Sequence, residues 1–151
     1  MASADQTEVQ DGTDSGEGAA EESILAASER PRSGRRSRGL LALFFIGSGV
    51  NHFVSPKWYE AIVPPPLQKQ AGPVVMLSGV AEIVGGAGVL LPWTRRLSGW
   101  GLVAVLAAVF PSNVYMAGAP ERFNKIPRWA LLARLPLQPL MMWWALRATR
   151  R

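Results

Sequence analysis

Two ionisable residues stand inside long apolar stretches, and their types and positions suit them best for chemistry. Glu82 lies near the middle of the apolar run 73–91, and Arg134 lies about seven residues into the run 128–147. A charged group in such a run is costly unless it finds a partner. At about 1.5 Å of rise per residue, the two lie about 13 Å and about 10 Å from the same surface. We therefore expect the carboxylate and the guanidinium to face one another.

Other polar residues lie at a similar depth in the neighbouring apolar runs. Ser78 precedes Glu82 by four residues and therefore shares its helical face, and Gln138 follows Arg134 by one turn. This convergence predicts a polar pocket in the outer half of a helical bundle. The same groups could instead hold the helices together, since polar side chains bond across helices in lipid. The candidate set is Glu82, Arg134, His52, Asn113, Ser78, Gln138 and Tyr115.

The sequence offers no catalytic constellation and no evident metal or cofactor ligands. It contains no cysteine, which excludes disulfides, thiolate metal sites and iron–sulfur clusters. Its single histidine, His52, cannot form a His-rich zinc or haem site alone. We expect His52 to be a hydrogen-bonded interfacial histidine rather than a ligand or a proton relay.

Four apolar segments would position these polar residues. A membrane-spanning helix needs about 20 predominantly apolar residues, within a range of about 17–25. The segments lack the period-two alternation of strands. The sequence therefore predicts an all-α, integral membrane four-helix bundle with up-down connectivity. The expected spans are about 37–54, 73–91, 95–117 and 128–147.

The first 36 residues have a different composition. Residues 1–29 contain eight acids and no Lys or Arg, and five arginines follow within 30–38. So few apolar residues cannot bury enough surface to offset chain entropy. We predict a disordered tail over 1–36, acidic and then Arg-rich, ahead of a transmembrane domain over 37–151.

The remaining chain is strongly basic, and membrane topology accounts for this better than nucleic acid does. Its basic residues flank the apolar runs, and their excess near span ends predicts the cytoplasmic side. With both termini inside, ten basic residues lie inside and five outside. We expect a multi-pass protein of the cell inner (plasma) membrane with both termini cytoplasmic, and no nucleic-acid partner.

The loop 55–72, expected outside, has an unusual composition. Trp58 and Tyr59 suit the headgroup layer, and three consecutive prolines, 64–66, favour extended backbone. We predict a short amphipathic helix at about 56–62 on the membrane surface. It would serve either as a stiff connector or as a lid over the outer mouth of the bundle.

Several short runs within residues 40–147 form a specific combination. They are Gly49-Val50-Asn51-His52-Phe53, Pro56, Trp58-Tyr59, Ser78-Gly79-Val80-Ala81-Glu82-Ile83, Pro92 with Thr94-Arg95-Arg96, Phe110-Pro111-Ser112-Asn113-Val114-Tyr115-Met116 and Arg134-Leu135-Pro136-Leu137-Gln138. In combination these runs resemble the DoxX-like family of small membrane proteins. The resemblance implies a four-helix integral membrane protein. The family takes its name from a subunit of an archaeal thiosulfate:quinone oxidoreductase, and some relatives are linked to redox complexes.

Two functional hypotheses follow. The first is a non-catalytic membrane subunit or scaffold in the lipid bilayer, which assembles with membrane or soluble proteins or with a second copy of itself. The second is a quinone- or small-molecule-binding subunit of a membrane oxidoreductase. In that case Glu82 and Arg134 would be the charged groups of the site, and His52 and Asn113 would be its hydrogen-bonding groups.

Overall fold

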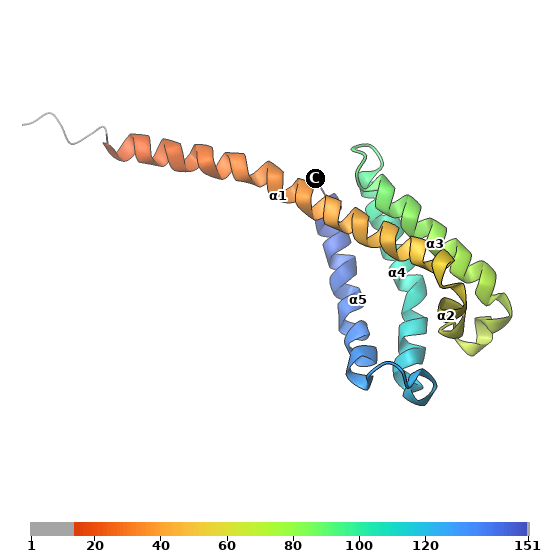
Figure 1. Cartoon of the computed structure of the whole chain (residues 1–151). Coiled ribbons are helices and arrows are strands. Elements are labelled where there is room, and N and C mark those ends of the chain that lie inside the picture. Colours follow the sequence, from red (N-terminus) through yellow and green to blue (C-terminus); the bar gives the residue numbers. More distant parts are fainter. Residues whose placement is uncertain (1–13, 151) are drawn as a thin grey trace, which may run out of the picture. The chain divides into compact units, whose positions relative to one another are not determined.

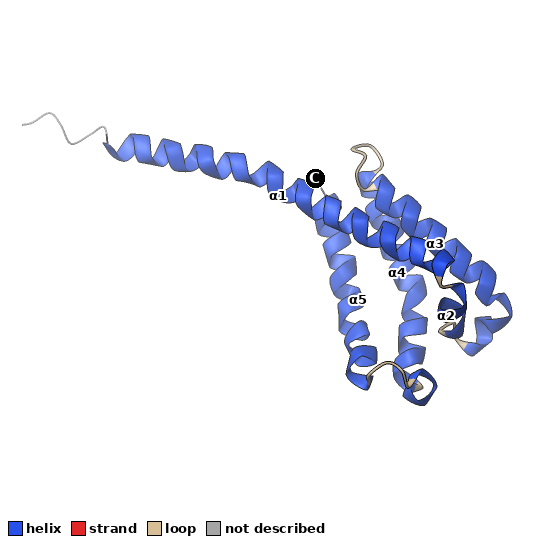
Figure 2. Cartoon of the chain, in the orientation of Figure 1, coloured by secondary structure: helices blue, strands red, loops and turns tan. Residues whose placement is uncertain are grey.

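The computed structural model describes the backbone of residues 14–150 and the side chains of residues 34–150. These residues form helices joined by short connections, with no strand among them (Figure 2). The all-α prediction is therefore confirmed. The elements are α1 (Asp14–Val54), α2 (Pro56–Ala61), η1 (Pro65–Gln70), α3 (Ala71–Gly88), α4 (Arg95–Gly118), η2 (Pro120–Phe123) and α5 (Arg128–Thr149) (Figure 1).

The chain divides into two units, Met1–Arg36 and Ser37–Arg151, and α1 contributes to both. The division falls where the acidic and Arg-rich composition gives way to apolar sequence. The predicted disorder differs from the structure over 14–36, which is helical; residues 1–13 lie outside the described residues. The run 17–29 is rich in Ala and Glu, both strong helix formers. Helix propensity therefore favours local structure even where burial cannot.

The second unit is a helical bundle of α3, α4, α5 and residues 37–54 of α1. Within it, α4 packs against α3 and α5, and α2 packs against α3 (Figure 1). The predicted short helix at 56–62 is present as α2. The two 3₁₀-helices, η1 and η2, were not predicted from the sequence.

Local chemistry accounts for several helix ends and bends. Pro56 begins α2, at the first helical position, where the missing N–H of proline costs nothing. At the end of α3, Thr94 Oγ1 donates to the Gly88 carbonyl at 2.7 Å, so one of the terminal carbonyls gains a partner. Inside α4, Pro111 removes one donor from the helical ladder.

Glycines allow α1 and α3 to approach each other closely. A Cβ atom added at Gly49 would lie 2.6 Å from the Gly79 carbonyl oxygen, and one added at Gly79 would lie 2.9 Å from the Cβ of His52. Any larger residue would force the backbones apart, as at other small-residue helix crossings. This crossing places His52 against α3.

Apolar clusters lie on either side of the polar residues along the bundle. The Phe45 cluster contains Leu41, Phe45, Val89, Leu102, Ala145 and Ala148. The Met116 cluster contains Ile62, Met116 and Leu131. On α5, Gln138 lies seven residues from Leu131 and seven from Ala145, about 10 Å along the axis from each. The polar layer is therefore held between two packed apolar regions.

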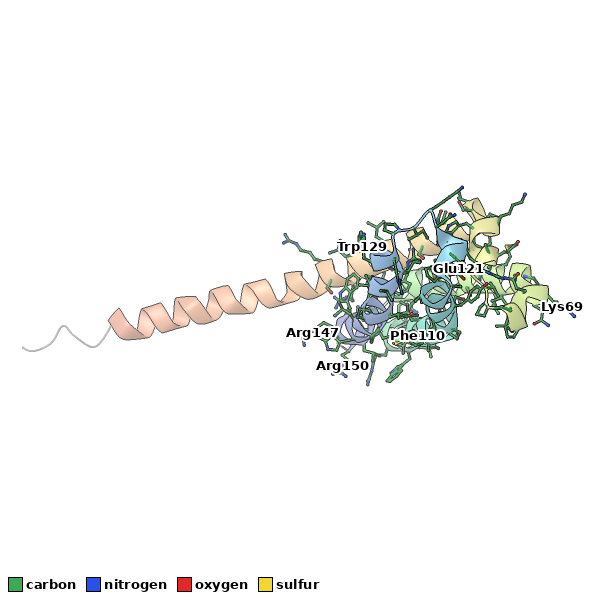
Figure 3. All side chains as sticks on the ribbon, turned by 90° about the horizontal axis from the view of Figure 1, so that it is seen from below. Lys69, Phe110, Glu121, Trp129, Arg147 and Arg150 are labelled. Carbon is green, nitrogen blue, oxygen red and sulfur yellow. The ribbon has the colours of Figure 1, made fainter. Side chains whose placement is uncertain are left out.

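Two helical segments, Pro65–Gly88 and Arg95–Gly118, are long and apolar enough to cross a membrane. Large apolar side chains are also exposed on the bundle. Trp93 is 80% exposed, and Trp129 is 72% exposed. Figure 3 shows side chains projecting outward around the bundle, with Trp129 and Phe110 among them.

Candidate functional site

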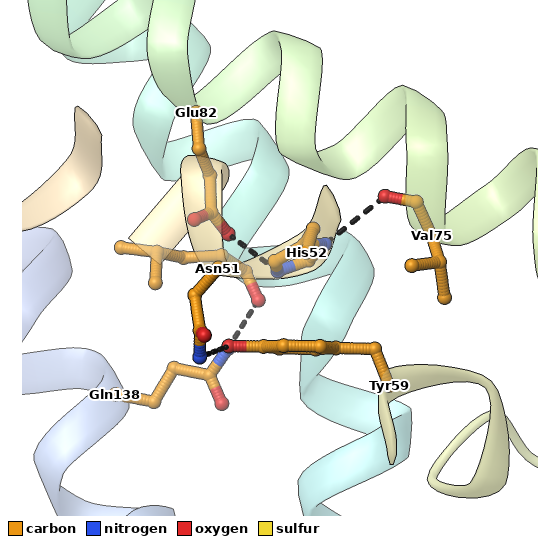
Figure 4. A network of polar contacts seen from close by, with 7 residues as sticks. Asn51, His52, Tyr59, Val75, Glu82 and Gln138 are labelled. Carbon is orange, nitrogen blue, oxygen red and sulfur yellow. Dashed lines mark hydrogen bonds and ion pairs between the residues drawn. The ribbon is translucent and has the colours of Figure 1, made fainter. Parts of the chain in front are cut away.

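The centre of the polar layer is an ionisable pair between α1 and α3. His52 Nε2 lies 3.7 Å from Glu82 Oε1, and both residues are buried. On the other side of the ring, His52 Nδ1 lies 3.0 Å from the Val75 carbonyl oxygen. Figure 4 shows the histidine held between these two groups of α3.

The hydrogen-bond geometry determines where the ring carries its proton. A carbonyl oxygen can only accept, so Nδ1 carries a hydrogen and donates it to Val75. A neutral ring would then present a lone pair on Nε2 toward the carboxyl group of Glu82. The 3.7 Å separation of Nε2 and Oε1 is longer than a hydrogen bond, and the contact is an ion pair only when the imidazole is protonated.

Residues around this pair cover it and extend its hydrogen bonding. The ring of Tyr59, on α2, stacks on the His52 ring with centroids 3.9 Å apart, and Asn51 Nδ2 donates to Tyr59 Oη at 3.0 Å. The Ser48 hydroxyl interacts with the carboxyl group of Glu82. Glu82 Oε2 is buried and has no hydrogen-bond partner of normal geometry among the described residues.

A second polar pair, without charge, joins α4 to α5. Asn113 Nδ2 donates to Gln138 Oε1 at 2.6 Å, and Gln138 Nε2 donates to the Leu106 carbonyl. Leu106 lies beside the stretch of α4 where Pro111 interrupts the ladder. Pro111 leaves the carbonyl of Ala107 without its helical donor, and Gln138 bonds to the carbonyl one residue before it.

The predicted Glu82–Arg134 pair is wrong, because Glu82 meets His52 instead. Arg134 lies with its guanidinium 5.7 Å from the Trp58 ring centroid, and its Nη1 lies 3.9 Å from Met116 Sδ. Arg134 and His52 lie at a similar distance along their helices, but the α1–α3 crossing places the imidazole of His52 beside Glu82. A cation–π contact replaces the expected carboxylate for Arg134.

The remaining candidates have other partners. The Tyr115 hydroxyl accepts a hydrogen bond from Arg122 Nη1 at 2.7 Å, and among the described residues none hydrogen-bonds to the Ser78 side chain. The seven candidates therefore form separate groups rather than one pocket. Sequence reasoning left four contributing residues out of the candidate set: Ser48, Asn51, Tyr59 and Trp58. Asn51 beside His52, and the Trp-Tyr pair in the 55–72 loop, were the available signals.

An open groove runs beside the His52–Glu82 pair. It holds about 500 Å³ and is lined by Phe44, Gly47, Ser48, Val50, Asn51, Val54 and Tyr59. Three of these carry polar groups that also belong to the surroundings of the pair, and the others are apolar or glycine. In the part of the chain that the structure describes, no three His, Cys, Asp or Glu side chains lie close enough to share a metal ion. The groove thus offers hydrogen-bonding groups beside an apolar surface.

Comparison with known proteins identifies a family without assigning an activity. No curated protein and no solved structure matches the chain. A family model described as a domain of unknown function (DUF8561) matches residues 41–149, which include both polar pairs. This match spans most of the chain, and the protein therefore belongs to the DUF8561 family.

Proposed function

We propose that the protein is a multi-pass membrane protein of DoxX-like type, with four spans formed by residues 37–54, α3, α4 and α5. Large apolar side chains exposed on all four segments support this, among them Leu43, Leu77, Leu97 and Leu140. Soluble monomers rarely expose apolar surface on this scale. A lipid solvent would make the same surface favourable.

We place the protein in the cell inner (plasma) membrane, with both termini in the cytoplasm. The turn between α3 and α4 would then face the cytoplasm, while η1 and η2 would face outward. Ten arginines would lie on the cytoplasmic side, at 30–38, 95–96 and 147–151, and five basic residues would lie on the outer side. This asymmetry is the usual one for cytoplasmic loops.

A cysteine-labelling experiment tests the orientation directly, because the natural chain has no cysteine. We expect an Asn124→Cys variant in intact cells to react with a membrane-impermeant maleimide. A matched Trp93→Cys variant should react only after the membrane is broken. Equal labelling of both positions in intact cells would refute the orientation, and recovery of the chain in the soluble fraction would refute the membrane location.

Within the membrane, we infer a role as a non-catalytic subunit or scaffold. The observation that carries this inference is that the interior polar groups are used in helix–helix contacts. His52–Glu82 joins α1 to α3, and Asn113–Gln138 joins α4 to α5. A bundle held in this way presents a stable surface to protein partners or to a second copy.

Isolation of the intact assembly tests the scaffold role. The full-length chain would be extracted in mild detergent and its associated proteins, lipids and quinones identified by mass spectrometry. A scaffold should co-purify with defined proteins at constant ratio, and these should be lost when its outward-facing apolar residues are replaced. A chain that purifies alone, as a monomer with full stability, would contradict the role.

The groove beside the charged pair favours a second candidate function, binding of a quinone or a similar amphiphile for a membrane oxidoreductase. A quinone has carbonyl acceptors on an apolar ring. Asn51 could supply a donor through the second hydrogen of its amide nitrogen, and Phe44 and Val54 could form apolar walls. Decylubiquinone binding to the purified chain should weaken in Asn51→Leu and persist in Ser78→Ala. Unchanged binding in both variants, or no binding to the natural chain, would exclude this candidate.

A further inference from the structure

A separate cavity lies at the end of the bundle where α2 leads into η1 and α4 leads into η2. It holds about 550 Å³, a volume within the usual range for small-ligand pockets. Its lining residues are Ala61, Pro65, Gln68, Tyr115, Arg122 and Phe123. Apart from Tyr115, these residues are outside the polar set discussed above, so the cavity needs its own explanation.

Arg122 gives the cavity a cationic wall. Its Nη1 donates to Tyr115 Oη at 2.7 Å, and the Tyr115 ring stands edge-on to Phe123 with centroids 5.9 Å apart. Among the described residues, no carboxylate lies within ion-pair distance of this guanidinium, the adjacent Glu121 included. A guanidinium has five N–H donors, so Arg122 retains donors for a bound anion.

The hydrogen-bond directions add a second donor and an acceptor. Because Tyr115 Oη accepts from Arg122, its own hydrogen remains available to donate. Gln68 Nε2 donates to the Glu60 carbonyl at 3.1 Å and to the Val63 carbonyl at 2.6 Å. With its amide nitrogen engaged, Gln68 offers Oε1 as an acceptor. The cavity therefore combines donors suited to an oxyanion with one acceptor suited to a hydroxyl.

We propose that this cavity binds the phosphate of an anionic phospholipid headgroup that also carries a hydroxyl, such as phosphatidylglycerol. Guanidinium groups bind phosphate through directed, charge-assisted hydrogen bonds. The apolar walls at Ala61, Pro65 and Phe123 suit the carbon skeleton of the headgroup. The lipid source rests on the proposed membrane location, whereas the oxyanion chemistry does not. Free phosphate is the alternative source of the same chemistry.

Lipid retention in nanodiscs tests the proposal. The full-length chain is placed in phosphatidylcholine nanodiscs with or without phosphatidylglycerol, and retained lipids are counted by native mass spectrometry. We expect phosphatidylglycerol to bind preferentially and Arg122→Gln to weaken it about tenfold, as loss of one charged hydrogen bond implies. Tyr115→Phe, which keeps the ring, should weaken it less. Lys125→Gln removes a charge from the same connection outside the cavity lining and should leave retention unchanged.

The other outcomes overturn the proposal. Equal losses in Arg122→Gln and Lys125→Gln would indicate attraction to total charge rather than a site. A second arm measures inorganic phosphate binding to the detergent-solubilised chain. If phosphate binds with the same dependence on Arg122 while phosphatidylglycerol is not retained, the ligand is a soluble anion. If the maleimide experiment also fails, both the membrane location and the lipid ligand are rejected. If the maleimide experiment shows the proposed topology, only the lipid ligand is rejected.

Discussion

The two polar pairs of the bundle differ in whether they can ionise and in whether their polar atoms are all hydrogen-bonded. Asn113–Gln138 is neutral, and Gln138 uses both its amide oxygen and its nitrogen in hydrogen bonds. His52–Glu82 is ionisable and leaves Glu82 Oε2 buried without a hydrogen-bond partner of normal geometry among the described residues. The neutral pair therefore has the satisfied hydrogen bonds expected of a structural helix–helix contact. The ionisable pair retains an oxygen that could accept a hydrogen bond, and its neighbours Ser48 and Asn51 line a groove.

This difference leaves only the ionisable pair with a buried oxygen that could accept a further hydrogen bond. Buried polar groups are nearly always hydrogen-bonded, and an exception calls for an explanation. Tyr59 covers one side of the His52 ring, and Ser48 and Asn51 open onto the groove. A ligand in the groove would contact Ser48 and Asn51, which are neighbours of the ionisable pair, while the neutral pair would keep α4 and α5 together.

The largest effect is expected from breaking the charged pair. His52→Leu leaves the carboxyl group either charged without a counterion or protonated without an acceptor, and should lower the free energy of unfolding by about 3–5 kcal/mol. His52→Leu combined with Glu82→Leu should lose less than His52→Leu alone, since no buried charge remains. A double-mutant cycle in detergent, followed by thermal unfolding, measures this coupling. Additive losses would mean that the two side chains act independently.

The positions of α4 and α5 could be predicted because they depend on local sequence. The apolar run predicted at 95–117 is α4, Arg95–Gly118, and the run predicted at 128–147 lies within α5, Arg128–Thr149. Length, apolar composition and proline positions are properties of one segment at a time. They require no knowledge of which helices are neighbours.

The partner of Glu82 could not be predicted in the same way. Residue spacing predicts only how far a side chain lies along its helix axis. By that measure both His52 and Arg134 lie at a depth similar to that of Glu82. The choice between them depends on the rotation of each helix and on which helix lies closest to α3. That closeness comes from Gly49 and Gly79, whose consequence becomes visible only when two segments are brought together. Arg122 was missed for the same reason, since η2 and Tyr115 together place it on the cavity.

The next largest effect should come from the crossing that brings His52 to α3. Gly49→Ala places a Cβ atom 2.6 Å from the Gly79 carbonyl oxygen, and overpacking of this kind costs about 1–3 kcal/mol. Gly39→Ala is the control on the same helix, because a Cβ there meets nothing within 4 Å. Thermal unfolding in detergent should separate the two. Equal melting temperatures for both variants would argue against a close α1–α3 crossing.

A smaller effect is expected from the neutral pair. Gln138→Leu removes the partners of Asn113 and of the Leu106 carbonyl, and interhelical hydrogen bonds in membranes are worth about 0.6–1.7 kcal/mol. Ser78→Ala is the control, because Ser78 is a polar residue of the bundle that makes neither of these contacts. Chemical unfolding of both variants would measure the loss. A decrease as large as that for His52→Leu would remove the distinction between the two pairs.

The smallest effect should come from the contact that links α2 to α5. Trp58→Leu removes the ring beneath Arg134, and a cation–π contact at an exposed site is worth about 0.5–1 kcal/mol. Trp129→Leu, at a 72% exposed position, controls for loss of a surface tryptophan.

Amide hydrogen exchange in Trp58→Leu then decides whether α2 is a lid or a connector. If α2 loses protection while α3 and α4 keep theirs, Trp58 anchors a lid whose Tyr59 covers the charged pair. If exchange rises equally in all the helices, α2 is a connector and access to His52 does not depend on it.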